Sequence, residues 1–327
     1  MEKLDSVANA LQSLASIKKI DDYGMFQMTY FGDYGFDEYL QVGTSIDTKY
    51  PDISQEPNIT GSGCTVFTTH NSKGDILLCR NYDWSYLGRA YTPSLQLQTR
   101  PKNGYSSVST VNLMFCGYGE NYLPSGLSLN SLDTLYAPYL PMDGLNAKGV
   151  AIAVLSVPEA KPPFTASKVT LTSVDAIRLV LDKAESVTQA VELLDQYNIF
   201  FPYDVYCQYF IADRSGQSVI VNFADGKMRV SESDKPYQIA SNQAASDYPT
   251  VDSCAGTCWR YDSVKEALAE SGGILNEKQA INLLEKVGHI NDGQNALRWT
   301  VIYNLTTLDG IIFANRKKDS LINFCLN

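Results

Sequence analysis

The residues whose types and spacing could carry out a reaction lie in a β-hairpin predicted to start at Cys64. Two runs of β-type residues flank the turn-forming residues 71–74, so the segment has the pattern of two antiparallel strands. Folding the chain about this turn places Cys64 across from Arg80, with Asp83 at the same end of the sheet. The spacing therefore predicts a thiol, a guanidinium and a carboxylate side by side.

These three groups have a shared chemical use. A guanidinium lowers the pKa of a nearby thiol and favours the thiolate, which is the nucleophilic form. If the peptide bond after Gly63 were cut, Cys64 would carry a free α-amine, whose pKa of about 7.7–8.0 suits a general base at neutral pH. Taken alone, the hairpin is also compatible with a plain core cysteine and a structural ion pair between Arg80 and Asp83.

Two other kinds of site receive less support from the sequence. The histidines are His70 and His289, and His70 is expected roughly 20 Å from Cys64 at about 3.3 Å per strand residue, which argues against a Cys–His dyad. Cys254 and Cys258 are not followed by a second pair of ligands at zinc spacing. No phosphate- or dinucleotide-binding motif occurs, so we expect neither a metal nor a cofactor.

The composition of the 327 residues limits the class of protein. The chain is 44% hydrophobic and its formal net charge is -10, which argues against nucleic acid as a partner because phosphate binding needs a basic surface. The seven cysteines are an odd number without a disulfide-like spacing, so free thiols in a reducing compartment are expected. No membrane span or signal-peptide core occurs. The sequence predicts a cytoplasmic protein, unless a signal peptide was removed.

The pattern along the chain changes at Cys64. Apolar spacings of three and four predict an amphipathic helix over 4–20, followed by an irregular stretch over 21–63. Ser186 with Gln189, and Asn276 with Gln279, have the spacing of capping boxes. Beyond residue 64, strands are predicted at 64–70, 75–82, 94–99, 107–115, 150–156, 205–213, 217–224, 227–231, 298–306 and 309–315, and helices at about 173–197, 259–271 and 276–288. This order predicts a layered α+β domain.

Five segments resemble, in the same order, those of the choloylglycine hydrolases and penicillin V acylases. Acid ceramidase and isopenicillin N acyltransferase are similar at a greater distance. The nucleophile of this family is a mature N-terminal Cys, followed by a hairpin and an Arg-Asn/Thr-Met/Trp-Asp block. The matching segments cover residues 64 to about 315 and are Arg80-Asn81-Tyr82-Asp83, Asp143-Gly-Leu-Asn146, Ile239-Ala-Ser-Asn242, Trp259-Arg260-Tyr261 and Trp299-Thr-Val-Ile-Tyr-Asn304.

The resemblance implies a role for each of these site residues. Cys64 would be the nucleophile, and Asp83 would hold its α-amine. Arg80 and Arg260 would favour the thiolate and shape the pocket. The Asn242 side chain would help to form the oxyanion hole.

Two features depart from the family pattern. Ser156, whose position supplies a backbone N–H to the oxyanion hole, replaces the Asn of bile salt hydrolases and the Tyr of penicillin V acylases, so a shifted substrate preference is expected. Bile salt hydrolases usually start at Met-Cys, whereas a long leader precedes Cys64 here. We predict that residues 1–63 cover the substrate cleft as a propeptide, removed or separated by autocleavage between Gly63 and Cys64, and that residues 64–327 form the amidase domain.

The resemblance implies a four-layer αββα sandwich of the N-terminal-nucleophile hydrolase type. The expected reaction is hydrolysis of a linear amide in a small acyl-amide substrate, such as a bile-salt conjugate or a penicillin-V-like compound. Transfer of the acyl group from Cys64 to an amine is one alternative, and an unprocessed relative that only binds an acylated ligand is another. The acyl group, the amine and the formation of a homo-oligomer are left open.

Overall fold

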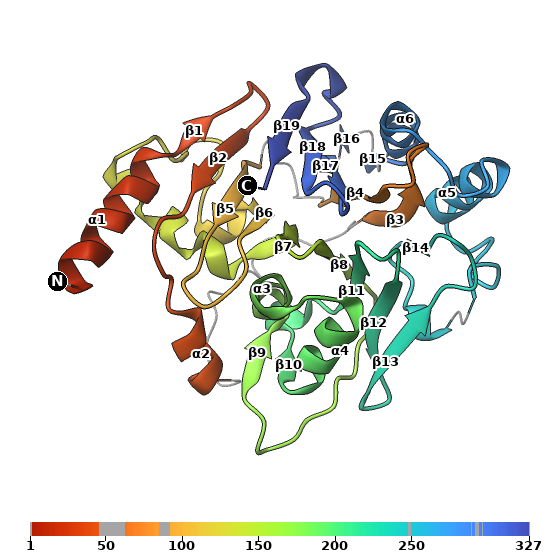
Figure 1. Ribbon diagram of the computed structural model, residues 1–327, viewed down its shortest axis with the longest axis horizontal. Coiled ribbons are helices and arrows are strands. Elements are labelled where there is room, and N and C mark those ends of the chain that lie inside the picture. Colours follow the sequence, from red (N-terminus) through yellow and green to blue (C-terminus); the bar gives the residue numbers. More distant parts are fainter. Residues whose placement is uncertain are drawn as a thin grey trace.

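The computed structural model describes residues 2–45, 63–84, 92–247, 250–288, 290–291, 294–295 and 297–326, so His289 lies outside the described residues. Two stacked β-sheets organise this part of the chain, with helices on their outer faces (Figure 1). None of the described helices is both long enough and apolar enough to cross a membrane.

The larger sheet has nine strands, and all neighbouring strands in it are antiparallel except β2 and β5. In spatial order the strands are β1 (Lys18–Lys19), β2 (Met25–Thr29), β5 (Ser94–Thr99), β6 (Ser107–Asn112), β7 (Pro141–Asn146), β8 (Val150–Ser156), β11 (Cys207–Asp213), β12 (Ser218–Ala224) and β13 (Lys227–Glu232). The long runs of buried residues in β6, β7, β8 and β11 follow from their central places in this sheet.

The smaller sheet has six antiparallel strands and contains the predicted hairpin. The order is β14 (Ile239–Ala240), β3 (Thr65–His70), β4 (Ile76–Asp83), β17 (Leu297–Asn304), β18 (Asp309–Ala314) and β19 (Ile322–Cys325). The hairpin register differs slightly from the predicted one, because Arg80 lies opposite Val66 rather than Cys64. Since Val66 and Cys64 are two residues apart, both project from the same face of β3.

Two pairs of helices complete the layers. The helices α3 (Ser173–Lys183) and α4 (Val187–Asp195) pack on the nine-stranded sheet, and α5 (Trp259–Glu270) and α6 (Glu277–Val287) pack on the six-stranded sheet (Figure 1). One apolar core joins residues of both sheets with α3 and α4, and a second lies under α5 and α6. The predicted four-layer αββα sandwich is confirmed.

Shorter elements connect these layers. The chain also forms α1 (Glu2–Ala15), α2 (Phe36–Val42), β9 (Thr170–Thr172), β10 (Asn198–Phe200), β15 (Ile290–Asn291), β16 (Gln294–Asn295) and the 3-10 helices η1 (Leu113–Cys116), η2 (Leu129–Tyr139), η3 (Pro202–Asp204), η4 (Ala245–Asp247) and η5 (Lys318–Ser320). The first helix ends at Ala15, short of the predicted residue 20. The stretch predicted to be irregular contains β2 and α2, and the predicted helix 173–197 is divided into α3 and α4.

The helix starts follow local side-chain chemistry. Asn276 and Gln279 form the predicted capping box, which begins α6. Ser186 caps α4 by accepting from the Gln189 N–H, but the Gln189 side chain accepts from the N–H of Glu185, one residue earlier than predicted.

Residues 2–45, which we call the N-terminal segment, form part of this fold. Strand β2 pairs with β5 over five residues, and Met25, Met28 and Phe36 are buried. The Thr44 N–H donates to the Thr170 carbonyl at 2.8 Å. Beside this bond, a Cβ on Gly43, which has φ +62, would lie 2.2 Å from the same carbonyl oxygen. The sequence therefore needs glycine there to bring the segment against β9.

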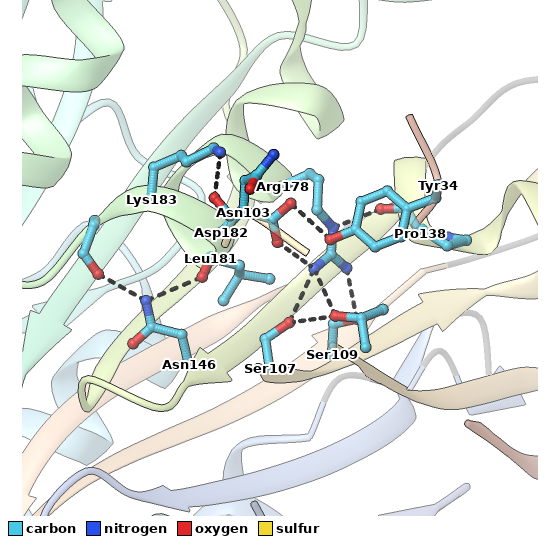
Figure 2. A network of polar contacts seen from close by, with 12 residues as sticks. Tyr34, Asn103, Ser107, Ser109, Pro138, Asn146, Arg178, Leu181, Asp182 and Lys183 are labelled. Atoms are coloured by element: carbon cyan, nitrogen blue, oxygen red, sulfur yellow. Dashed lines mark hydrogen bonds and ion pairs between the residues drawn. The ribbon is translucent and has the colours of Figure 1, made fainter. Parts of the chain in front are cut away.

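A buried polar network ties the N-terminal segment to α3 (Figure 2). The Arg178 guanidinium is fully buried and lies 3.2 Å from one carboxylate oxygen of Asp182, and the other oxygen accepts a 2.6 Å hydrogen bond from the Tyr34 hydroxyl. Arg178 donates further to Ser107 and to the carbonyl of Pro138. Because buried charges need partners, Tyr34 is one of the groups that satisfy this cluster.

Two further contacts reach α3 from the N-terminal segment. The Lys183 ammonium is 2.5 Å from the Asp37 carboxylate. The Tyr39 hydroxyl donates to the Asp175 carboxylate at 2.7 Å. Together with Tyr34, these residues attach the segment to both ends of α3.

Candidate active site

Cys64 lies directly before β3, with 2% of its surface exposed. Its sulfur lies 4.0 Å from Nη2 of Arg80 and donates a 3.9 Å hydrogen bond to the backbone carbonyl of Asp83. The fold thus brings together the three residues that the hairpin predicted as neighbours.

The protonation of Cys64 is governed by its burial. Desolvation raises the pKa of the thiol above its ordinary value; the Arg80 guanidinium lowers it in part, and the Asp83 carboxylate raises it further. The net direction is opposite to the one predicted from Arg80 alone, because the cost of burying a thiolate exceeds the attraction of one guanidinium. In the uncleaved chain the thiol is therefore protonated at neutral pH.

Arg80 is held by groups that the hairpin pattern did not include. The guanidinium is fully buried, and its Nη1 lies 3.0 Å from the carboxylate of Asp143 on β7. The same carboxylate accepts from the indole of Trp299 at 2.9 Å and from the Tyr303 hydroxyl at 2.7 Å. Arg80 also donates to the backbone carbonyls of Met142 and Val154. These bonds fix the guanidinium beside the sulfur.

Asp83 is fully buried at the end of β4, opposite Leu297. Its backbone carbonyl accepts a 3.2 Å hydrogen bond from the N–H of Gly63, which holds the residue before Cys64 in place. Arg298 is a second buried arginine here and donates to the carbonyl of Trp84 at 2.8 Å. Burial lowers the pKa of Arg298, while the Asp83 carboxylate raises it. Arg298 was not predicted as a site residue, because no local pattern shows that its strand reaches Asp83.

Arg260 and Asn242 reach the same place from a different part of the chain. Arg260 is the second residue of α5 and is 7% exposed. Its Nη1 donates to the backbone carbonyls of Gly63 and Cys64, the second at 2.6 Å, and its Nη2 donates to the Asn242 side-chain oxygen at 3.1 Å. The Asn242 amide nitrogen in turn donates to the carbonyl of Ser156 at 2.8 Å and to its hydroxyl at 3.0 Å. All seven residues predicted for the site therefore lie in one connected network.

A cavity of about 480 Å³ opens beside Cys64. Much of its wall is aromatic, and strand β4, η1, η2 and the N-terminal segment all contribute to it. The aromatic lining residues are Tyr39, Tyr82, Trp84, Phe115, Tyr139 and Tyr203. Among the described lining residues, Asp175 is the one charged side chain, and burial raises its pKa. Such a cavity fits an apolar group of moderate size.

The structure also locates the residues of the competing site types. His70 ends β3, at the opposite end of the strand from Cys64. All seven cysteines lie in the described part of the chain, and none of them forms a disulfide there. Within the described ranges, no three His, Cys, Asp or Glu side chains are grouped so that they could hold a metal ion.

Comparison with known proteins identifies the family. The sequence model of the linear amide C-N hydrolases, choloylglycine hydrolase family, matches residues 64–250, more than half of the chain. No curated protein matches the chain. A mutant of the conjugated bile acid hydrolase from Clostridium perfringens has a similar structure, with a TM-score of 0.55, 12% identity, and 81% of this chain and 92% of that chain covered.

Penicillin V acylase from Agrobacterium tumefaciens is also similar in structure. Its TM-score is 0.51 and its identity 17%, with 77% of this chain and 83% of that chain covered. At such low identity these two likenesses establish the fold, and the family model carries the assignment. The match begins at Cys64, the residue at which the site begins. The chain is therefore a member of the choloylglycine hydrolase family and a hydrolase of carbon–nitrogen bonds in linear amides.

Proposed function

We propose that this protein hydrolyses N-acyl amides with an apolar acyl group, using Cys64 as the nucleophile after the chain has cut itself between Gly63 and Cys64. The observation that carries the proposal is the position of Cys64, whose thiol lies at the wall of the aromatic cavity and beside Arg80. Cys207 lines the same cavity, but its sulfur donates to the Val205 carbonyl, whereas the Cys64 sulfur accepts from Arg80.

The reaction has two halves. The Cys64 sulfur attacks the substrate carbonyl, and the α-amine of the same residue carries the thiol proton to the leaving nitrogen. Asp83, buried at this strand end, orients that amine. Water then hydrolyses the thioester, which releases the acid and restores the thiol. The Asn242 amide stabilises the oxyanion once it exchanges its contact with Ser156 for the substrate, an interaction worth about 2.7–4 kcal/mol.

The lining of the cavity supports an uncharged acyl group. Its aromatic walls favour apolar or aromatic substituents, and the Asp175 carboxylate disfavours an anionic one. Two proteins of similar structure are named for conjugated bile acid and for penicillin V, and we include both compounds among the candidate substrates. Ser156, which lines the cavity, is smaller than the Asn or Tyr expected from the family pattern, so we expect the substrate preference of this protein to differ from those of the two enzymes.

The N-terminal segment stays bound after the cut. Strand β2 is an integral strand of the nine-stranded sheet, and Tyr39 and Thr44 line the cavity itself. Removing the segment would expose the edge of β5 and the buried charges at Asp182, at the cost of unpaired backbone and side-chain groups. Residues 2–45 of the predicted propeptide would thus be separated from Cys64 by the cut but remain part of the substrate pocket, while residues 46–62 lie outside the described residues.

A panel of amides tests this function. The purified protein is incubated with a bile-salt conjugate, phenoxymethylpenicillin, fatty acyl amides and N-acyl homoserine lactones, and the released amines are quantified. We expect turnover of uncharged acyl groups, with slower turnover of matched acyl groups that end in a carboxylate. The same reactions run with an added amine reveal acyl transfer. A protein with a free Cys64 amine that hydrolyses none of these amides would contradict the proposal.

A further inference from the structure

The guanidinium of Arg260 is in contact with the bond that the proposed self-cleavage would break. Its Nη1 donates to the carbonyl oxygen of Gly63, which is the acyl oxygen of the Gly63–Cys64 peptide bond. The same nitrogen donates to the Cys64 carbonyl at 2.6 Å and to the Thr65 hydroxyl at 3.2 Å. A buried cation is therefore placed on the carbonyl next to a thiol.

A hydrogen bond to Asn242 holds the Arg260 guanidinium in this position. The Nη2 atom donates to the Asn242 side-chain oxygen, and Asn242 is itself fixed by its bonds to Ser156. The start of α5 carries the side chain, which is 7% exposed. The Asn242 amide nitrogen points to Ser156 in this arrangement, so the donor expected to serve substrates is engaged elsewhere.

We propose that Arg260 is the oxyanion-stabilising residue of self-cleavage, distinct from the Asn242 amide that serves substrate hydrolysis. This inference rests on the proposed cut between Gly63 and Cys64 and adds a catalytic group to it. The precursor has no α-amine, and desolvation keeps its thiol protonated. Polarising the Gly63 carbonyl makes it a better electrophile and compensates for the weaker nucleophile.

The step balances without an added reagent other than water. The Cys64 sulfur forms a bond to the Gly63 carbonyl carbon, and the negative charge that develops on the oxygen is met by Arg260. The bond between this carbon and the Cys64 nitrogen then breaks, and the thiol proton ends on that nitrogen, leaving a thioester and an amine. Water hydrolyses the thioester, which frees the thiol and leaves a carboxylate at Gly63.

The alternative is that Arg260 only anchors the start of β3. An arginine elsewhere in the chain provides a matched control for this reading. Arg316 is also partly buried and donates to two backbone carbonyls, those of Gly288 and Glu285, at 3.0 and 2.7 Å. Arg316→Gln removes the same kind of anchor away from Cys64.

The test measures the rate at which a new N-terminus at Cys64 appears in timed samples of freshly synthesised full-length chain, by intact mass. We expect Arg260→Gln to slow the cut by roughly 100-fold or more and Arg260→Lys to slow it less, since the charge remains. Arg316→Gln should cut at the wild-type rate. Millimolar guanidinium should restore part of the rate in Arg260→Ala, which a purely structural anchor would not allow.

Equal cutting rates for the wild type and a folded Arg260→Gln protein would overturn the inference. If Arg260→Gln does not fold, Arg260→Lys and Arg260→Ala decide instead. A wild-type cutting rate in Arg260→Lys, together with no rescue of Arg260→Ala by guanidinium, would equally overturn the inference. A wild-type chain that is never cut would instead overturn the proposed self-cleavage, so the two failures are distinguishable.

Discussion

At the scale of single residues, the site depends on how the buried charge of Arg80 is paired. Arg80 is neutralised by Asp143 at 3.0 Å, so its guanidinium can sit 4.0 Å from the Cys64 sulfur without leaving a buried charge unpaired. The Arg80 cation lowers the pKa of the Cys64 thiol and burial raises it. The effect of burial is the larger one in the uncleaved chain, so the net pKa is raised.

Replacing Cys64 by Ala should abolish both the cut before residue 64 and amide hydrolysis, because one sulfur serves both reactions. Intact mass and amine release from a cleavable amide measure the two outcomes. Cys79→Ala is the matched control, since Cys79 is also buried in this hairpin but packs in the core under α5 and α6. Residual cutting or turnover in Cys64→Ala would remove Cys64 from the mechanism.

The rate of self-cleavage should rise with pH. Burial raises the pKa of the Cys64 thiol, so the thiolate is the minor form at neutral pH and its fraction grows about tenfold per pH unit below that pKa. Timed samples of the full-length chain, from mildly acidic to mildly alkaline pH, give the profile. A rate that falls as the pH rises would show that thiolate formation does not limit the cut.

At the scale of elements, α3 serves as the support for the substrate pocket. Its first turn carries Asp175, which lines the cavity, and its last turn carries Asp182, which is paired with Arg178. Each of these carboxylates accepts a hydrogen bond from a tyrosine hydroxyl of the N-terminal segment. The helix thus links the pocket wall to the segment that the proposed cut would separate.

Tyr34→Phe should lower the free energy of unfolding by about 1–3 kcal/mol, because it leaves a buried carboxylate oxygen of Asp182 with one hydrogen bond fewer. Chemical denaturation measures the change. Tyr136→Phe is the control, since 68% of Tyr136 is exposed. Equal losses of stability in the two variants would mean that the Tyr34 hydroxyl contributes nothing.

The hairpin and the start of α6 could be predicted because their signals are local, whereas the four-layer order was implied by the family resemblance. Turn formers between two β-type runs predicted β3 and β4, and the Asn276–Gln279 box predicted the start of α6. Strand β7 was not among the strands predicted from the residue pattern, since it contains Pro141 and Gly144; it becomes a strand because β6 and β8 pair with it.

The site residues divide in the same way. Cys64, Arg80 and Asp83 follow from the hairpin spacing, and Asn242 and Arg260 were predicted from the family resemblance alone. The partner of Arg80 could not be predicted, because Asp143, Trp299 and Tyr303 meet only when strands of both sheets are stacked. Their roles in catalysis remain predictions for the experiments described above.

At the scale of the whole molecule, the fold is assembled from residues on both sides of the proposed cut. The nine-stranded sheet contains β2 from before Cys64 and seven strands from after it, with β1 at the edge. The cavity is likewise lined from both sides, by Tyr39 and Thr44 on one and by Tyr82 and Trp84 on the other.

After self-cleavage, the two fragments should elute together in size-exclusion chromatography and separate only when a denaturant is added. A denaturing gel of the peak fraction shows both, and amide hydrolysis should follow that peak. A chain that begins at Cys64 and is expressed without the N-terminal segment should be poorly folded. If such a chain is fully active, the segment is not part of the pocket.

The parallel pairing of β2 with β5 has a further consequence for refolding. While the chain is intact, the two strands are tethered, and their association is unimolecular and independent of protein concentration. Once the tether is cut, the same pairing becomes a bimolecular encounter whose rate depends on dilution. A protein that recovers from denaturation before the cut would recover slowly or not at all afterwards, so the lifetime of the active form would depend on its rate of unfolding. Self-cleavage would then commit each molecule to a single folding event.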